Sequence, residues 1–425
     1  MSEPAAAAAP AEERHATWLE LFFDLVVVAA VAQLAHLLHE DITWEKVLVF
    51  GVAYYAMWTV WTTFTLYANV TGVRTRQRSM LLAMFGIAVM AASVPLMEHG
   101  EVHAFVIAYI ACRILANISF NRTNRLMTEW PTAQQAAGLI PWFASLGDYE
   151  DERVRYGLWI TSIVLDVFFS VVRSRDPKAL LEEERSERVR SLRRHHRERE
   201  VGRVLQLQAA DPDRPHLGER LGLFVIIVLG EAVAQLVNAA ADVTGDVGQW
   251  RRPEFTVLVL GFGLLVALWW LTLRYGPSSA PTYGVRVFAL RLTMPAHYLT
   301  TVSIVVIAAG LGSLAAHPEG HVEPSARIVL CTGAALYFLT ATVLGARGGA
   351  PWRWVLGWGV PSVLVCTAAA VFAGPLRAWA LLAVVLATAL WHIAYRRVSG
   401  GATSAEADDD PPEIAPGGHE VEGPV

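Results

Sequence analysis

Long apolar runs are the feature that most limits how this chain can fold. A helix crosses the hydrocarbon core of a membrane with about 20 mostly apolar residues, and hydrophobic residues make up 54% of the chain against 17% charged. This composition excludes an ordinary soluble protein and predicts an all-α polytopic membrane protein. The runs of sufficient length cover 18–39, 46–68, 79–97, 102–120, 154–173, 221–241, 255–275, 288–314, 326–346, 354–374 and 376–395.

A twelfth segment, 130–147, is weaker, and the charges of the connecting loops decide how it is counted. Basic residues mark the cytoplasmic loops of membrane proteins. If 130–147 is the fifth span, the basic connections all fall on one side, and the acidic loops fall on the other. We therefore expect about 12 transmembrane helices with both termini cytoplasmic, in the inner (plasma) membrane. The basic connections are those around 74–78, 122–125, 173–203, 274–291, 347–353 and 396–397.

Two segments repeat each other and divide the chain into halves. LELFFDLVVVAAVAQL at 19–34 and LGLFVIIVLGEAVAQL at 221–236 agree at nine of sixteen positions, and the following spans begin with VLVFG and VLVLG. Six spans per half would place both halves in the same direction, as a parallel repeat. The predicted division is a cytoplasmic N-terminal tail, a first six-helix repeat, a charged cytoplasmic connector, a second repeat and a disordered acidic tail, at 1–17, 18–173, 174–219, 220–397 and 398–425.

One acidic residue lies in the middle of the run at 221–241. Glu231 is expected near the bilayer midplane, where an ionised carboxylate is unfavourable unless it is protonated, paired or facing a polar cavity. Arg113, in the fourth span, is the obvious partner for a carboxylate. Gln235 and Asn238 follow on one helical face, and Gln33 and His36 occupy the matching positions of the first repeat. The predicted coupling or polar site comprises Glu231, Gln235, Asn238, Gln33, His36, Arg113 and Asp166.

A second group of polar residues falls near the cytoplasmic ends of the repeat-related spans. We expect Arg220 to contact Glu20 or Asp24, because these residues occupy corresponding ends of the two spans. The predicted interfacial cluster comprises Glu20, Asp24, His216, Glu219 and Arg220. The sequence contains no nucleotide-binding, nucleophile or zinc motif, so no cofactor, metal, catalytic residue or nucleic-acid partner is predicted. The expected partners are membrane lipids and an unknown small substrate or ion, and the oligomeric state is not assigned.

These same residues carry a family resemblance. WLELFFDLVVVAAVAQLAHLL and HLGERLGLFVIIVLGEAV resemble two signatures of the bacterial low temperature requirement protein A family. The resemblance implies a multi-pass inner-membrane protein but no established biochemical activity. One departure is WWLTLRYG, where the family tends to have an acidic residue after WWL. By position, the resemblance points to Glu20, Phe22, Phe23, Asp24, Gln33, His216, Glu219, Arg220, Gly230 and Glu231.

Two classes of function stay open at this point, beside a purely structural network of interhelical contacts. In the first, the protein is a secondary transporter or ion-coupled permease with a midplane site at Glu231. In the second, it is a membrane-state sensor or a lipid-modifying enzyme that uses the interfacial cluster. The depth of the largest polar cavity should discriminate between them, because a midplane cavity favours transport and a shallow cytoplasmic pocket favours interfacial chemistry.

Overall fold

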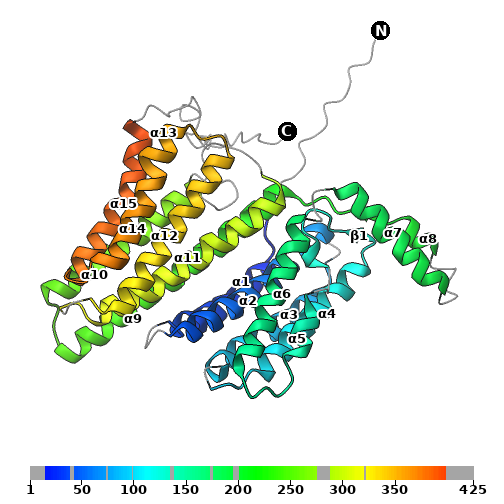
Figure 1. Ribbon diagram of the computed structural model, residues 1–425, viewed down its shortest axis with the longest axis horizontal. Coiled ribbons are helices and arrows are strands. Elements are labelled where there is room, and N and C mark those ends of the chain that lie inside the picture. Colours follow the sequence, from blue (N-terminus) through cyan, green and yellow to red (C-terminus); the bar gives the residue numbers. More distant parts are fainter. Residues whose placement is uncertain are drawn as a thin grey trace, which may run out of the picture.

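The computed structural model defines a bundle of long helices with a short helical arm (Figure 1). The predicted tails lie largely outside the described residues, and so does the stretch that follows Arg274. The described residues are 15–38, 43–72, 75–97, 99–134, 138–172, 176–194, 201–274, 288–319 and 322–398.

Eleven helices in the described part of the chain are long and apolar enough to cross a membrane, as expected for an all-α polytopic membrane protein. The first half contains α1 (Trp18–His36), α2 (Trp44–Thr71), α3 (Gln77–Met97), α4 (His103–Asn121), strand β1 (Arg125–Leu126), the 3-10 turn η2 (Pro131–Ala133), α5 (Leu139–Ala144) and α6 (Glu152–Val172). The connector contains α7 (Pro177–Arg194), α8 (Val201–Leu205) and strand β2 (Gln208–Ala209). The second half contains α9 (Arg214–Val247), α10 (Arg252–Trp269), the π-helical turn η5 (Trp270–Arg274), α11 (Leu290–Ala316), α12 (Pro324–Arg347), α13 (Trp352–Trp354), the π-helical turn η6 (Val355–Gly359), α14 (Val360–Phe372) and α15 (Ala378–Val398).

The starts of α1 and α9 follow from local capping chemistry. Thr17 and Glu20 form a reciprocal capping box at the start of α1, which satisfies backbone N–H groups that have no partner within the helix. Asp213 caps α9 by accepting a hydrogen bond from the His216 backbone N–H, and Pro215 follows in the first turn. These caps fix where both helices begin, and therefore the relative height of the charged residues one turn later.

Helix α2 is buried on all sides and forms the centre of the molecule. Every residue from Val52 to Val70 is buried, as expected for a helix that is apolar around its whole circumference. It contacts α1, α3, α4 and α6 of its own half and α9 and α11 of the other half. The two halves meet mainly where α1 and α2 pack on α9 and α11, so side chains on these helices decide how the halves are joined.

The predicted fifth span is not a spanning helix. In the described part of 130–147, which leaves out 135–137, the helical elements are the three-residue turn η2 and the six-residue helix α5. Pro131, Gly138 and Pro141 explain the interruption, because proline removes a backbone donor and glycine disfavours the helical state. The prediction of twelve transmembrane helices is therefore not confirmed.

This broken segment nevertheless runs the length of the bundle. Asn117, near the end of α4, donates a hydrogen bond to the Gln134 carbonyl, and His103, at the start of α4, contacts the Leu146 carbonyl at 3.3 Å. These contacts are about 14 residues apart on α4, or about 21 Å at 1.5 Å per residue. Irregular backbone at such depth is tolerated where protein covers it, and α4 and α6 supply that cover. We refer to residues 130–147 as the broken crossing.

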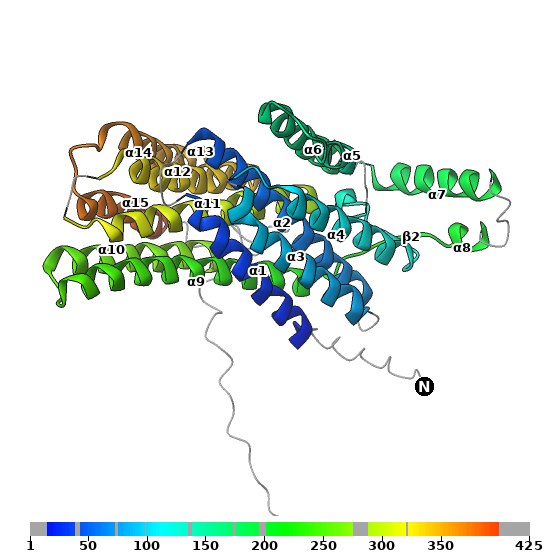
Figure 2. The ribbon, with the colours of Figure 1, turned by 90° about the horizontal axis from the view of Figure 1, so that it is seen from below.

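Some helix contacts of the first half have counterparts in the second. Helix α1 packs on α3 and α3 on α4, while α9 packs on α11 and α11 on α12. Figure 1 shows α9 to α15 gathered on one side of the molecule and α1 to α6 on the other. The connector helices α7 and α8 project away from the bundle (Figure 2), and a parallel two-residue pairing of β1 with β2 ties the connector to the end of α4.

Candidate functional site

A buried ion pair joins the two halves. Arg220 of α9 donates a hydrogen bond to Asp24 Oδ1 of α1 at 2.7 Å, and both side chains are at most 1% exposed. The Trp61 indole of α2 donates to the same oxygen at 2.8 Å. The expected contact between Arg220 and a first-span carboxylate is thus present. Because three helices contribute to one carboxylate, the pair fixes their relative height.

A second polar contact lies one turn closer to the helix starts. His216 Nε2 is 3.6 Å from Glu20 Oε2, with both side chains buried. The Asn69 side chain of α2 lies 3.0 Å from His216 Nδ1 and also bonds the backbone of Asp213 in both directions. Glu20 is shared with the capping box of α1, so part of its role is structural. The fifth predicted member of this cluster, Glu219, is exposed and lies 3.9 Å from His15 Nδ1.

The two ion contacts also set the direction of the helices. Glu20 and Asp24 are four residues apart on α1. Their partners His216 and Arg220 are also four residues apart on α9, in the same order along the chain. Helices α1 and α9 therefore run parallel where they touch.

His297 holds α2, α9 and α11 together in the core. The Trp58 indole donates to His297 Nδ1 at 3.1 Å, so the ring proton of neutral His297 is on Nε2, which faces the Leu221 carbonyl at 3.2 Å. The ring stacks on Trp61 with centroids 5.6 Å apart. Both nitrogens are engaged by structural partners, so the geometry gives this histidine a packing role.

Glu231 lies about 11 residues beyond Arg220 on α9, deeper in the bundle. Its side chain accepts a hydrogen bond from Gln235 at 2.6 Å. In the described residues, no arginine or lysine lies within salt-bridge distance of it. The predicted polar stripe is only partly enclosed, because Glu231 and Gln235 are buried whereas Gln33, His36 and Asn238 are exposed.

Arg113 pairs with Asp166 and not with Glu231. The Arg113 and Asp166 side chains approach to 3.7 Å and are 3% and 4% exposed. The face of α4 that carries Tyr109, Arg113 and Asn117 is directed at the broken crossing: Tyr109 packs on Trp142, and Asn117 donates a hydrogen bond to the Gln134 carbonyl. Arg113 therefore meets Asp166, another member of the predicted polar site, while α4 packs on α5 of the broken crossing.

The broken crossing packs directly on this second pair. A Cβ atom at Gly138 would lie 2.3 Å from Asp166 Oδ1, so the carboxylate rests against bare backbone. Thr132 donates to the Asp166 carbonyl, and Ser162 of α6 donates to the Gly138 carbonyl. The Ser162 bond satisfies a backbone carbonyl that an unbroken helix would have paired internally. The site therefore combines a buried ion pair with non-helical backbone.

Two cavities among the described residues are lined neither by Glu231 nor by the interfacial cluster. A polar cavity of about 220 Å³ lies at the ends of α2 and α4, and an apolar one of about 490 Å³ lies between α3 and α4. Among the described residues no group of three His, Cys, Asp or Glu side chains could hold a metal ion. The cysteines Cys112, Cys331 and Cys366 are buried free thiols.

The sequence reading missed the contributions of α2. Trp58, Trp61 and Asn69 each bond a charged or polar residue of the other half or of α1. The available signal was their position on a helix with no charged residue after Lys46, since buried Trp and Asn require a hydrogen-bond partner. It could not be used without knowing which helices surround α2.

The fold and site define a multi-pass helical membrane protein with buried charged pairs between its helices. The model of the bacterial low temperature requirement A protein (LtrA) family matches residues 15–394. The chain belongs to this family, and the resemblance inferred from its two signatures is confirmed.

The chain is also similar to a protein of Rhizobium meliloti whose activity is not described. The chain is 26% identical over 283 residues to an uncharacterized protein of Rhizobium meliloti (strain 1021). The alignment covers 63% of this chain and 61% of that protein, so the chain spans less than two thirds of its relative's length. No solved structure matches the chain.

Proposed function

We propose that the protein is an ion-coupled secondary transporter, with a substrate pathway that follows the broken crossing past Arg113 and Asp166. The observation that carries this proposal is the broken crossing itself. Interrupted spans whose unwound backbone lies against charged groups near the membrane midplane are typical of transporter binding sites. Irregular backbone at membrane depth is found where it is buried in protein or lines a water-filled cavity.

The charged residues at the broken crossing suit a pathway for a polar solute. Arg113 lies in the middle of α4, where an unpaired cation is costly, and Asp166 neutralises it from α6. The pair is joined at 3.7 Å without a short hydrogen bond between its charged atoms. A substrate or ion with its own charge could therefore exchange for one partner.

Glu231 is the proposed proton-exchanging group of this transporter. A neutral amide is its hydrogen-bond donor, and no Arg or Lys of the described chain is close enough to hold it in the ionised form. A buried carboxylate in that setting can gain and lose a proton as access to the two sides alternates. Arg113 pairs with Asp166. It therefore does not hold Glu231 in a fixed ion pair.

We further propose that residues 18–173 and 220–397 form two parallel repeats, with the charged connector 174–219 between them and both termini cytoplasmic. The parallel contact of α1 with α9 and the helix contacts that have counterparts in both halves support this arrangement. Two such halves could rock about their interface at α1, α2, α9 and α11, as in other transporters with parallel repeats. Superposing residues 18–120 on 220–346 would test it, and an antiparallel best fit would contradict it.

The alternative of interfacial chemistry by the Glu20, Asp24, His216 and Arg220 cluster has less support. An enzyme acting on lipid headgroups needs a pocket that opens to the interface. The four side chains are at most 4% exposed. Their hydrogen bonds to α2 fit a fixed joint between the halves.

Flux measurements in proteoliposomes test the transport proposal. Wild-type protein would be screened against protons, monovalent cations and small organic anions, each with an imposed pH gradient. Glu231→Gln keeps the side-chain shape and should abolish pH-dependent flux while the protein still folds and inserts. Asp242→Asn, an exposed acid on the same helix, is its matched control and should transport normally.

A second pair of variants tests the pathway. Gly138→Ala places a methyl group against Asp166 and should lower flux, because the carboxylate must shift relative to Arg113. Gly157→Ala on the exposed face of α6 meets no atom within 4 Å and should leave flux unchanged. Unaltered pH-dependent flux in Glu231→Gln would remove this residue from the mechanism, and unaltered flux in Gly138→Ala would remove the broken crossing from the pathway.

A further inference from the structure

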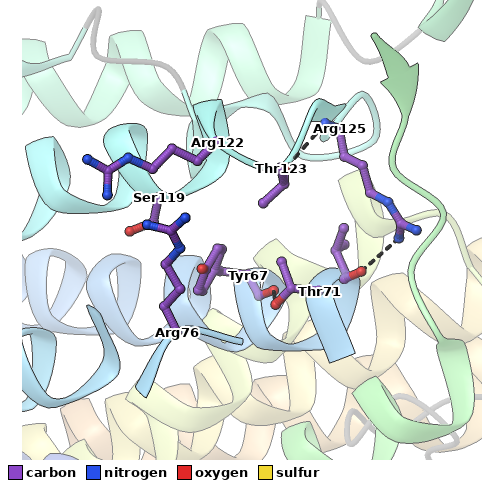
Figure 3. Close-up of a pocket in the computed structure, with 8 residues that line it drawn as sticks. Tyr67, Thr71, Arg76, Ser119, Arg122, Thr123 and Arg125 are labelled. Atoms are coloured by element: carbon purple, nitrogen blue, oxygen red, sulfur yellow. Dashed lines mark hydrogen bonds between the residues drawn. The ribbon is translucent and has the colours of Figure 1, made fainter. Parts of the chain in front are cut away.

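The polar cavity at the ends of α2 and α4 has the composition of an anion site. It is lined by Arg76, Arg122 and Arg125 together with the hydroxyl-bearing residues Tyr67, Thr71, Ser119 and Thr123 (Figure 3). No carboxylate lines this cavity. Residues 46–97 and 102–128, which supply its lining, contain no Asp or Glu. Three guanidinium groups with no acid among them leave the cavity strongly positive.

Two of these arginines have no acidic partner in the part of the chain that the structure describes. The Arg76 and Arg122 side chains are exposed, and Figure 3 shows their guanidinium groups on the same side of the cavity, beside Ser119. Arg125 lies across the cavity and donates to the Val70 carbonyl at 2.7 Å. Planar guanidinium groups bind phosphate oxygens in pairs of parallel hydrogen bonds, so a phosphate is the anion that this arrangement fits best.

An apolar groove shares helix α4 with this cavity. The groove lies between α3 and α4, and its lining includes Leu82, Gly86, Ala111 and Leu115. On α4, Ala111, Leu115, Ser119 and Arg122 follow at intervals of three or four residues, so groove and cavity share one helix face. Leu115 and Arg122 are about 10 Å apart along the axis at 1.5 Å per residue.

The groove is a built feature of the helix pair. Gly86 lets α3 approach α4 so closely that a Cβ atom there would lie 2.2 Å from Cys112 Sγ. The Ser119 hydroxyl donates to Ser79 at 3.0 Å and joins the two helices between cavity and groove. Small side chains on α4, Ala104, Ala108 and Ala111, leave the groove open toward the membrane.

We propose that the α3–α4 face binds an anionic phospholipid, with its phosphate between Arg76 and Arg122 and one acyl chain in the apolar groove. A free phosphate would use the arginines but not the groove, so the position of cavity and groove on one face of α4 favours the lipid. Basic pockets between transmembrane helices on the side of the basic loops bind anionic headgroups in this way. The site is separate from Arg113, Asp166 and Glu231, and it does not depend on the transport proposal.

Native mass spectrometry of the full-length protein in detergent tests this site. The protein would be titrated separately with phosphatidylglycerol, phosphatidylcholine and inorganic phosphate. Wild-type protein should bind phosphatidylglycerol at least about tenfold more tightly than phosphatidylcholine, since charge-assisted hydrogen bonds of this kind contribute one such factor or more. Arg76→Gln/Arg122→Gln should remove that preference.

Matched controls separate a specific site from general attraction. Arg78 is exposed and close in sequence but does not line the cavity, so Arg78→Gln should keep the preference. Ala111→Phe fills the groove and should weaken phosphatidylglycerol binding without affecting inorganic phosphate. Ile118→Phe, on the exposed face of α4 outside the groove, should affect neither ligand.

Three results would overturn the proposal. Equal binding of the two lipids by wild-type protein would show that the arginines do not select an anionic headgroup. An equal loss in Arg78→Gln would show non-specific attraction. Tight binding of inorganic phosphate, together with normal lipid binding by Ala111→Phe, would assign the cavity to a free anion.

Discussion

The buried pair of Asp24 and Arg220 gives the sharpest prediction about stability. Asp24→Asn keeps the size of the side chain and leaves an oxygen that can still accept the Trp61 hydrogen bond. It removes the charge that balances Arg220, which is fully buried. We therefore expect Asp24→Asn to destabilise the folded protein through an uncompensated cation between the two halves.

The expected magnitude follows from the geometry. Two unit charges 2.7 Å apart attract by about 6 kcal/mol at an effective dielectric constant of about 20, and desolvation offsets part of this attraction. Breaking such a pair from one side costs about 3–5 kcal/mol of unfolding free energy. Arg220→Gln should cost a similar amount. The double variant should be more stable than the sum of the two losses implies, with a coupling of about 2–3 kcal/mol.

Unfolding by sodium dodecyl sulfate in mixed micelles, followed by tryptophan fluorescence, measures these free energies. Asp242→Asn, on the exposed part of α9, is the matched control and should change stability by less than about 0.5 kcal/mol. The reasoning fails if Asp24→Asn is as stable as that control. It also fails if the losses of the two single variants simply add, because the residues would then not be coupled.

Two further predictions concern the packing of the core. His297→Phe should destabilise the protein by about 1–3 kcal/mol in the same unfolding assay, because the buried Trp58 indole loses its acceptor; a variant as stable as wild type would contradict the proposed joint between α2, α9 and α11. Gly310→Ala should cost at least about 1–3 kcal/mol, because its Cβ would lie 2.8 Å from the α12 backbone, whereas Gly230→Ala meets no atom within 4 Å and should be neutral or slightly stabilising. Equal effects of the two glycine substitutions would show that the approach of α11 to α12 does not control stability.

Several features of the site could be anticipated from the residues alone. The nine shared positions of the two signatures place Asp24 and Arg220 near corresponding ends of related helices, and that placement led to the expectation of a contact. The four-residue spacing of Tyr109, Arg113 and Asn117 places them on one face of α4. Such inferences succeed because helical periodicity and the energetic demand to pair a buried charge are local properties of the sequence.

The identity of the partners could not be anticipated in the same way. Arg113 had several carboxylates available, and the choice of Asp166 over Glu231 depends on α6 lying beside α4. The exposure of Gln33, His36 and Asn238 likewise depends on how far α1 and α9 diverge beyond their contact. Neighbours in a bundle are set by the summed packing of all its helices, which no single segment encodes.

The sequence by itself determined the membrane class, the eleven long spans, the family and the positions of the buried charges, because apolar length and helical period are written into each segment. Only the tertiary structure decided the form of the fifth crossing. Pro131, Gly138 and Pro141 weaken a helix there, but a broken segment can lie at membrane depth only if neighbouring helices satisfy its backbone. Asn117, on α4, and Ser162, on α6, do so, and their availability follows from the assembled fold.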